Sequence, residues 1–486
     1  MSGKMLKFVS RPQEGPQKRA ADARVDDFQE IYGDYIREKA EAQAGRCSQC
    51  GVPFCQTHCP LHNNIPDWLM LTAEGRLEEA YHVSQETNTF PEICGRICPQ
   101  DRLCEGNCVI EQSKHGTVTI GAVEKFLTET AFEKGWVRPL SPREERPESI
   151  GVIGAGPAGL AAADKLRRQG YQVHIYDRYD RAGGLLIYGI PGFKLEKDVV
   201  IRRWDQLKDG GAHFHLDFEV GRDASLEELR ARHDALLIAT GVYKARSLSV
   251  PGVGAAGVVK AMTFLTASNR KGLGDEVAAF DDGSLNAAGK DVVVIGGGDT
   301  AMDCVRTAIR QEAKSVTCLY RRNRENMPGS LREVANAEEE GIVFEWLAAP
   351  KAVLGSANGV TGVRAVRMRL GQADASGRQS PEPIEGSDFD LPADLVIEAL
   401  GFDPEDIPGL FGAPELAVSR WGTIRVDFQT QMTSLDGVYA AGDIVRGASL
   451  VVWAIRDGRD AADAIHKRLQ GGAGDKARRA PAVAAE

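Results

Sequence analysis

The pattern of apolar and polar positions changes near residue 149. Before it, apolar residues gather in stretches that predict helices, such as PDWLMLTAEGRLEEAYHVSQ (66–85), and PLSPREERPE (139–148) is typical of a linker. From Ser149 the chain reads as strand, helix and strand, and the same plan starts again at Asp291. We therefore expect an α/β fold with two doubly wound domains, preceded by a helical domain.

The first strand-helix-strand unit, SIGVIGAGPAGLAAADKLRRQGYQVHIYDR (149–178), contains a phosphate-binding turn. Gly154, Gly156 and Gly159 form the motif G-x-G-x-x-G directly after the predicted strand. These glycines permit a tight turn, close approach of a pyrophosphate, and close packing of helix on strand. The second strand ends at Asp177, whose carboxylate can accept hydrogen bonds from ribose hydroxyls. This order of elements predicts a dinucleotide site.

The second unit, KDVVVIGGGDTAMDCVRTAIRQEAKSVTCLYRRNR (290–324), repeats the glycine turn. Gly296, Gly298 and Ala301 fill the G-x-G-x-x-G/A form. Asp299 has the character of a helix N-cap. A second dinucleotide site is therefore expected here.

The second strand of this unit, SVTCLY, is followed by arginines rather than by an acid. An acid would repel the 2′-phosphate of NADPH, whereas arginine can clamp it. Arg321 and Arg322 therefore predict NADPH in preference to NADH, and Arg324 is expected on a solvated turn. Cys304 and Cys318 are expected to be core thiols.

Eight of the ten cysteines lie in two sets near the N-terminus. The first set has the spacing C-x2-C-x4-C-x3-C-P and the second C-x3-C-P-x4-C-x3-C. Bacterial ferredoxins use similar runs, in which the fourth cysteine binds the other cluster. Structural zinc is the alternative, but only the first pair has the C-x2-C spacing of a zinc knuckle. Disulfides are disfavoured in a reducing compartment.

Crossed ligation assigns the cysteines to two 4Fe-4S clusters. Cluster 1 would be bound by Cys47, Cys50, Cys55 and Cys108. Cluster 2 would be bound by Cys59, Cys98 and Cys104, with Cys94 as the simple choice for a fourth ligand.

Composition limits the remaining possibilities. The length of 486 residues suggests about three domains. The net charge of −10 argues against nucleic-acid binding. We expect neither a signal peptide nor a membrane span, and therefore a cytoplasmic protein. The polar tail, 471–486, is expected to be disordered.

Several strings resemble the small subunits of bacterial NADPH-dependent glutamate synthases. Besides both cysteine sets and both glycine turns, they are GGLLIYGIPGFKL (183–195), IATG (238–241), YRR (320–322) and VYAAGDIVRGASLVVWAIRDGRDAA (438–462). The same design recurs in the electron-input part of dihydropyrimidine dehydrogenase. Those pyrimidine-reducing relatives use a side chain from a later helix as the eighth cluster ligand, and Glu124 lies at the matching place. The resemblance favours Glu124 slightly over Cys94.

The resemblance implies FAD in the first unit and NADPH in the second. The FAD domain would then be discontinuous (149–262 and 400–470), with the NADPH domain (263–399) inserted and the iron–sulfur domain (1–140) in front. Implied FAD contacts are Gly154, Gly156, Pro157, Ala158, Gly159, Asp177, Gly183, Gly184, Leu185, Gly241, Gly442 and Asp443. Implied NADPH contacts are Gly296, Gly298, Asp299, Thr300, Arg321 and Arg322.

The function that the resemblance implies is electron input. NADPH would reduce the flavin, and single electrons would pass through the clusters to a large (alpha) subunit that makes L-glutamate from L-glutamine and 2-oxoglutarate. The chain opens MSGK rather than with a cysteine nucleophile, and no stretch remains for an FMN barrel. The alternatives are a reductase for another acceptor, such as a pyrimidine-reducing partner, and a zinc-containing regulatory module without turnover.

Overall fold

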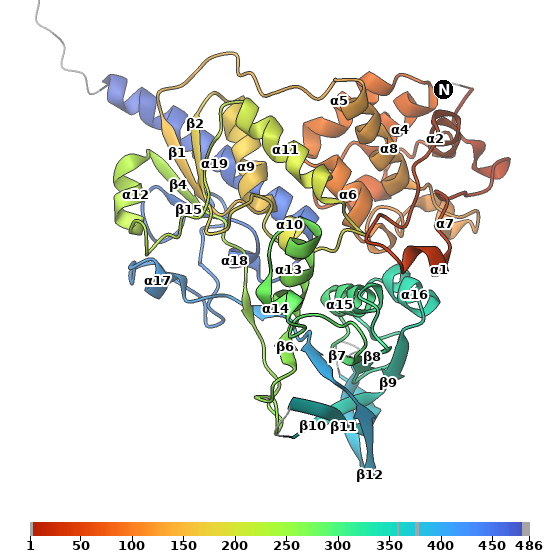
Figure 1. Cartoon of the computed structure of the whole chain (residues 1–486). Helices are drawn as coiled ribbons and strands as arrows, with labels where there is room; N and C mark the ends of the chain where they lie inside the picture. Colours follow the sequence, from red (N-terminus) through yellow and green to blue (C-terminus); the bar gives the residue numbers. More distant parts are fainter. Residues whose placement is uncertain (1–2, 357–358, 375–378, 479–486) are drawn as a thin grey trace, which may run out of the picture.

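A computed structural model describes residues 3–356, 359–374 and 379–478 (Figure 1). Figure 1 shows a helical N-terminal region (red to orange) beside two sheet-containing regions. Two five-stranded parallel sheets with covering helices confirm the expected fold class.

The first sheet has the strand order β15-β4-β1-β2-β3, and all its pairs are parallel. Its strands are β1 (Ser149–Ile153), β2 (Gln172–Tyr176), β3 (His213–His215), β4 (Ala235–Ile238) and β15 (Val438–Ala440). Its helices are α9 (Pro157–Arg168), α10 (Leu185–Tyr188), α11 (Lys197–Asp209), α12 (Leu226–Arg232), α17 (Ile407–Leu410), α18 (Asp443–Arg446) and α19 (Val451–Arg478).

The second sheet has the order β6-β13-β7-β8-β9 and is also parallel. Its strands are β6 (Val258–Lys260), β7 (Asp291–Ile295), β8 (Ser315–Tyr320), β9 (Val343–Trp346) and β13 (Leu395–Glu398). Its helices are α13 (Ala261–Gly272), α14 (Ala278–Asp281), α15 (Asp299–Arg310) and α16 (Leu331–Glu339). An antiparallel sheet of β10 (Ala348–Ser356), β11 (Gly359–Ala373) and β12 (Gln379–Pro392) projects below it in Figure 1.

The N-terminal region is built from short helices around a core of its own. Its 3-10 helices are η1 (Lys7–Val9) and η2 (Gln100–Arg102). Its α-helices are α1 (Ala21–Arg24), α2 (Arg37–Ala44), α3 (Phe54–Thr57), α4 (Ile65–Ala73), α5 (Leu77–Thr87), α6 (Pro91–Ile97), α7 (Val109–Gln112) and α8 (Ile120–Glu133).

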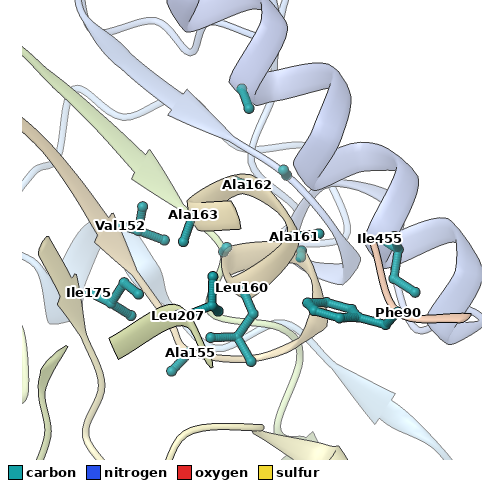
Figure 2. Close-up of a cluster of buried hydrophobic side chains, with 14 of the residues drawn as sticks. Phe90, Val152, Ala155, Leu160, Ala161, Ala162, Ala163, Ile175, Leu207 and Ile455 are labelled. Atoms are coloured by element: carbon teal, nitrogen blue, oxygen red, sulfur yellow. The ribbon is translucent and has the colours of Figure 1, made fainter. Parts of the chain in front are cut away.

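The largest core surrounds α9 (Figure 2). Strand residues Val152 and Ile175 contribute from one side and Ile455 of α19 from the other, while Phe90 comes from the N-terminal region. Helix α19 packs very closely on α9, because a Cβ at Gly458 would lie 2.1 Å from the carbonyl oxygen of Ala158. The N-terminal region therefore shares a core with the first sheet.

The start of the inserted domain differs from the sequence expectation. Strand β6 (Val258–Lys260) pairs with β13 of the second sheet, so the inserted region begins before residue 263. The crossing between the two sheets is marked instead by the short antiparallel pair β5 (Lys244–Ala245) and β14 (Phe402–Asp403).

Helix α19 continues to Arg478, into the part of the chain (471–486) that we expected from its composition to be disordered. Extending an existing helix needs no new nucleation, so a weak helix-forming sequence can follow a strong one. Residues 479–486 lie outside the described part of the chain.

Candidate functional site

A cavity of about 530 Å³ lies where the three regions meet. Its walls include Gly156 and Asp177 from the first sheet, Thr300 from α15, and Cys98 from the N-terminal region. Residues of both glycine-turn units and a cysteine of the N-terminal region therefore border one cavity.

The first glycine turn has the shape that a pyrophosphate requires. Gly154 has φ +110°, and a Cβ there would lie 2.4 Å from the carbonyl oxygen of Ala239. A Cβ at Gly159 would meet the carbonyl oxygen of Gly154 at 1.9 Å, which explains the close packing of α9 on β1. A Cβ at Gly156 would meet no atom within 4 Å, so the turn faces open space beside Pro157. These residues fit a dinucleotide on the N-terminus of α9.

Asp177 lies at the end of β2 and lines the cavity. Its carboxylate accepts hydrogen bonds from the backbone N–H groups of Ala155, at 2.6 Å, and Tyr179, at 2.9 Å. Burial raises its pKa, and the two backbone donors oppose that rise. The two backbone donors thus fix the orientation of this carboxylate in the cavity wall.

Some of the other expected FAD residues line the cavity, and others shape the backbone next to it. Gly184 and Leu185 line the cavity, as do Ala158, Gly241 and Asp443. Gly183 and Gly442 have positive φ and shape the backbone behind the wall. Burial raises the pKa of Asp443 to about 7.

Sequence reasoning missed several cavity residues. The hydroxyl oxygen of Thr240 is buried and has no hydrogen-bond partner among the described residues, as expected where a ligand completes the site. Arg178 pairs with Glu405 at 3.0 Å and lies over the ring of Tyr243. Glu405 is far from Arg178 along the chain, so spacing alone carried no signal for this pair.

The second glycine turn repeats the geometry of the first. Gly296 has φ +152°, and a Cβ there would lie 2.2 Å from the carbonyl oxygen of Ala399. Gly298 faces open space and is the N-cap of α15. The expectation that Asp299 caps this helix is therefore wrong. Asp299 lies in the first turn, and its carboxylate accepts a hydrogen bond from the Ser330 N–H at 2.8 Å.

The three arginines after β8 have different surroundings. Arg324 pairs with Glu338 at 2.9 Å. Arg321 is exposed, and Arg322 has a buried Nε without a hydrogen-bond partner in the described ranges. Arg322 therefore has a free donor near the end of β8, where a 2′-phosphate is expected. Cys304 and Cys318 are fully buried, which confirms them as core thiols.

Four cysteines surround one small cavity in the N-terminal region. Cys47, Cys50, Cys55 and Cys108 line it together with apolar side chains. The pKa of Cys55 is raised to about 12, mainly by burial and further by its neighbours Cys47 and Cys108. The set matches the crossed ligation expected for cluster 1, and thiolates around an apolar pocket fit an iron–sulfur group.

The remaining cysteines gather around Glu124. Burial raises the pKa of Cys104, and the nearby charges of Glu105, Cys98, Cys59 and Glu124 add to the rise. Cys94 is buried too, and the same kinds of neighbour raise its pKa. Cys94 and Cys98 belong to one packed cluster with Cys59 against it, and Asn88 hydrogen-bonds both Cys94 and Glu124. The candidate groups for cluster 2 therefore lie in one part of the N-terminal region.

A single-ion site finds no support. Four thiolates on one zinc would lie roughly 3.8 Å apart. No group of three or more His, Cys, Asp or Glu residues in the described part of the chain is arranged to hold one metal ion. Each iron of a cluster instead takes its own thiolate, which spreads the ligands further apart.

None of the described helices is long and apolar enough to cross a membrane.

Comparisons with known families agree with this division. Residues 24–136 match the family described as dihydropyrimidine dehydrogenase domain II, 4Fe-4S cluster. Residues 148–458 match the family of pyridine nucleotide-disulphide oxidoreductases. Among solved structures, Mycobacterium tuberculosis FprA in complex with NADPH shares the fold at 22% identity and a TM-score of 0.58, covering 68% of this chain and 86% of that chain.

Named relatives cover nearly the whole chain. The putative oxidoreductase AegA of Escherichia coli is 46% identical over 95% of this chain and 71% of its own length. The glutamate synthase [NADPH] small chain of Azospirillum brasilense is 66% identical over 99% of both chains. With its 4Fe-4S region, its two dinucleotide-type sheets and this identity, the chain belongs to the family of small chains of NADPH-dependent glutamate synthase.

Proposed function

We propose that this chain takes electrons from NADPH through FAD and passes them through two 4Fe-4S clusters to a large subunit that makes L-glutamate from L-glutamine and 2-oxoglutarate. One observation carries the proposal. A single cavity is lined by the first glycine turn, by Thr300 at the start of α15, and by Cys98 of the cysteine region. Donor, flavin and first acceptor would therefore meet in one place.

The residues of the first sheet would bind and orient FAD. When bound, FAD accepts a hydride from NADPH and releases single electrons, so the protein needs no general acid or base. The Asp177 carboxylate would accept hydrogen bonds from the adenosine ribose, and the N-terminus of α9 would face the pyrophosphate. Asp443 would face the ribitol hydroxyls.

The residues of the second sheet would bind NADPH. The open turn at Gly298 and the N-terminus of α15 would face its pyrophosphate. Arg321 and Arg322 would hold the 2′-phosphate, which NADH lacks.

Two sets of side chains would bind the clusters. Cys47, Cys50, Cys55 and Cys108 would hold cluster 1, and Cys59, Cys98, Cys104 and Glu124 would hold cluster 2, with Cys94 nearby. Cys98 lines the shared cavity, which supports cluster 2 as the first to receive electrons.

Reconstitution tests the proposal. Alone, the holoprotein should oxidise NADPH with a dye acceptor and form no glutamate. With a glutamate synthase large subunit it should form glutamate with NADPH as sole donor. Absence of glutamate from a correctly assembled complex would contradict the partner assignment.

A second acceptor remains a specific alternative. The family that matches residues 24–136 is named after a domain of dihydropyrimidine dehydrogenase, and AegA is named a putative oxidoreductase. Efficient electron transfer to a pyrimidine-reducing partner, without glutamate formation, would favour this alternative and leave electron input unchanged.

A further inference from the structure

The short segment Pro328–Ser330, between β8 and α16, braces the second glycine turn. The backbone N–H of Gly329 donates to the carbonyl oxygen of Gly297 at 3.0 Å. The N–H of Ser330 donates to the Asp299 carboxylate at 2.8 Å. A Cβ at Gly329 would lie 3.2 Å from the Gly297 carbonyl oxygen, so the segment approaches the turn closely. Movement of this segment would therefore move the turn.

The cysteine region holds the other side of the same segment. Arg102 donates from Nη1 to the carbonyl oxygen of Pro328 at 2.6 Å and from Nη2 to that of Gly329 at 2.5 Å. Arg102 lies in the loop between Cys98 and Cys104, two of the ligands proposed for cluster 2. One guanidinium thus joins the cluster loop to the brace of the NADPH turn.

The next residues bring a second cation to the cluster side. Helix α16 starts at Leu331, and Arg332 lines the cavity where the three regions meet. Cys98 and Arg332 line this same cavity, so the cation and the proposed cluster ligand border one space. The Nε of Arg332 is buried and has no hydrogen-bond partner among the described residues.

We propose that the segment Pro328–Arg332 couples the NADPH site to the loop of cluster 2, with Arg102 as the positioning residue that joins them. The proposal rests on the proposed function. Coupling between two sites is reciprocal. If NADPH on the turn favours one arrangement of the cluster 2 loop, that arrangement favours NADPH binding by the same free energy. Because direct hydrogen bonds of Arg102, Gly329 and Ser330 join the loop to the turn, no distant pathway is needed.

The test compares the holoproteins of the wild type and Arg102→Ala. Loss of the guanidinium should weaken NADP⁺ binding about fivefold or more, measured by titration of the flavin absorbance. The KM for NADPH should rise by a similar factor, while kcat with a dye acceptor stays near the wild-type value. Arg102→Lys keeps one charged donor and should restore part of the affinity.

A spectroscopic measurement separates coupling from a merely structural role. NADPH added to the dithionite-reduced wild type should shift the electron paramagnetic resonance signal of cluster 2, and Arg102→Ala should remove the shift. Lys18→Ala is the matched control, because Lys18 also joins the N-terminal region to α16, through Glu339 at 2.5 Å, without touching Pro328–Ser330. It should leave affinity and spectrum unchanged.

Unchanged NADP⁺ affinity in Arg102→Ala, or a wild-type signal that does not respond to NADPH, would overturn the coupling. If NADPH failed to reduce the flavin of the wild type at all, the proposed function would fall first, and the coupling with it.

Discussion

The side-chain amide of Asn63 donates a hydrogen bond to Oε1 of Glu124 at 3.0 Å, and both residues are buried. Asn88 donates to the same oxygen at 3.1 Å. Both amides thus hold one carboxylate oxygen and leave Oε2 outside these two bonds. A buried carboxylate held in one direction among cysteines is suited to act as a ligand.

We predict that Glu124, rather than Cys94, is the eighth cluster ligand. Glu124→Ala should lose most of the iron of cluster 2, whereas Cys94→Ala should keep about eight irons per chain. Iron and acid-labile sulfide analysis of the two purified variants measures this. Loss of a cluster in Cys94→Ala but not in Glu124→Ala would reverse the assignment, and about four irons in the wild type would contradict two clusters.

Selectivity for NADPH should depend on Arg321 and Arg322. Each charge-assisted contact with a phosphate contributes about 1.5–3 kcal/mol, so replacing both by neutral residues should raise the KM for NADPH about tenfold or more per arginine. The KM for NADH should change little. Arg324→Ala is the matched control, since Arg324 is paired with Glu338. An unchanged ratio of the two KM values would remove Arg321 and Arg322 from the site.

The sequence predicted those parts of the site whose chemistry is local. The glycine turns were recognisable because Gly154 and Gly296 need φ values and close contacts that side chains exclude. Long-range contacts carried no such signal. Arg24 pairs with Glu340 at a separation of 316 positions, and sequence spacing cannot predict such a pair. Strand β6 was missed because three residues after a turn resemble a linker.

Glu340 should be essential for stability. Its buried carboxylate pairs with Arg24, Arg306 and Arg310. Burial acts to raise its pKa, but Arg306 and Arg310 lower it to about 2. Glu340→Gln would leave the buried guanidinium of Arg310 without a negative partner and take one of two carboxylate partners from Arg24 and Arg306, at a cost of about 3–5 kcal/mol. Urea unfolding measures the loss. The neighbouring Glu339→Gln should cost less than about 1 kcal/mol, because Glu339 is half exposed. Equal losses in both variants would contradict the argument.

The same network changes the design of truncation experiments. Deleting residues 1–135 would remove Arg24 from Glu340 and Glu92 from the buried Arg203, with which it pairs at 2.7 Å. Loss of activity after that deletion would therefore report damage to both sheets as well as loss of the clusters. Point variants in the full chain are needed to follow the electrons.

Four histidines pack together on the first sheet. His174 lies 3.1 Å from His215, between Nδ1 and Nε2, and its ring stacks on that of His213 at 4.8 Å. His233 accepts or donates hydrogen bonds at both ring nitrogens, with Ser149 at 2.7 Å and Tyr176 at 2.9 Å. The pKa of His233 is lowered to about 4, mainly by burial and further by His174, His215 and Arg232, while Asp234 opposes them.

Stability should therefore fall as this cluster is acidified. The unfolded state binds a proton at His233 below about pH 6.5, while the folded state resists until about pH 4, so stability is present above pH 6.5 and is lost between these values. After discounting for solvent screening, His233→Gln should reduce that loss by about 1–2 kcal/mol. The unfolding temperature at pH 7 and pH 4.5 measures it. Identical pH dependence in variant and wild type would show that the histidine cluster does not cause the loss of stability.

Cluster 1 should be the exit to the partner. Cys98 lines the large cavity, whereas Cys50 lines the small one, and no described residue lines both. This order predicts that electrons pass from the flavin through cluster 2 to cluster 1. In the full chain, Cys50→Ala should therefore abolish NADPH-dependent glutamate formation with the large subunit. Oxidation of NADPH by a dye should survive, because flavin and nicotinamide meet before cluster 1 is reached.

Size-exclusion chromatography should show that the variant still assembles with the large subunit. Glutamate formation at the wild-type rate by a variant that lacks cluster 1 would show that electrons leave by another route.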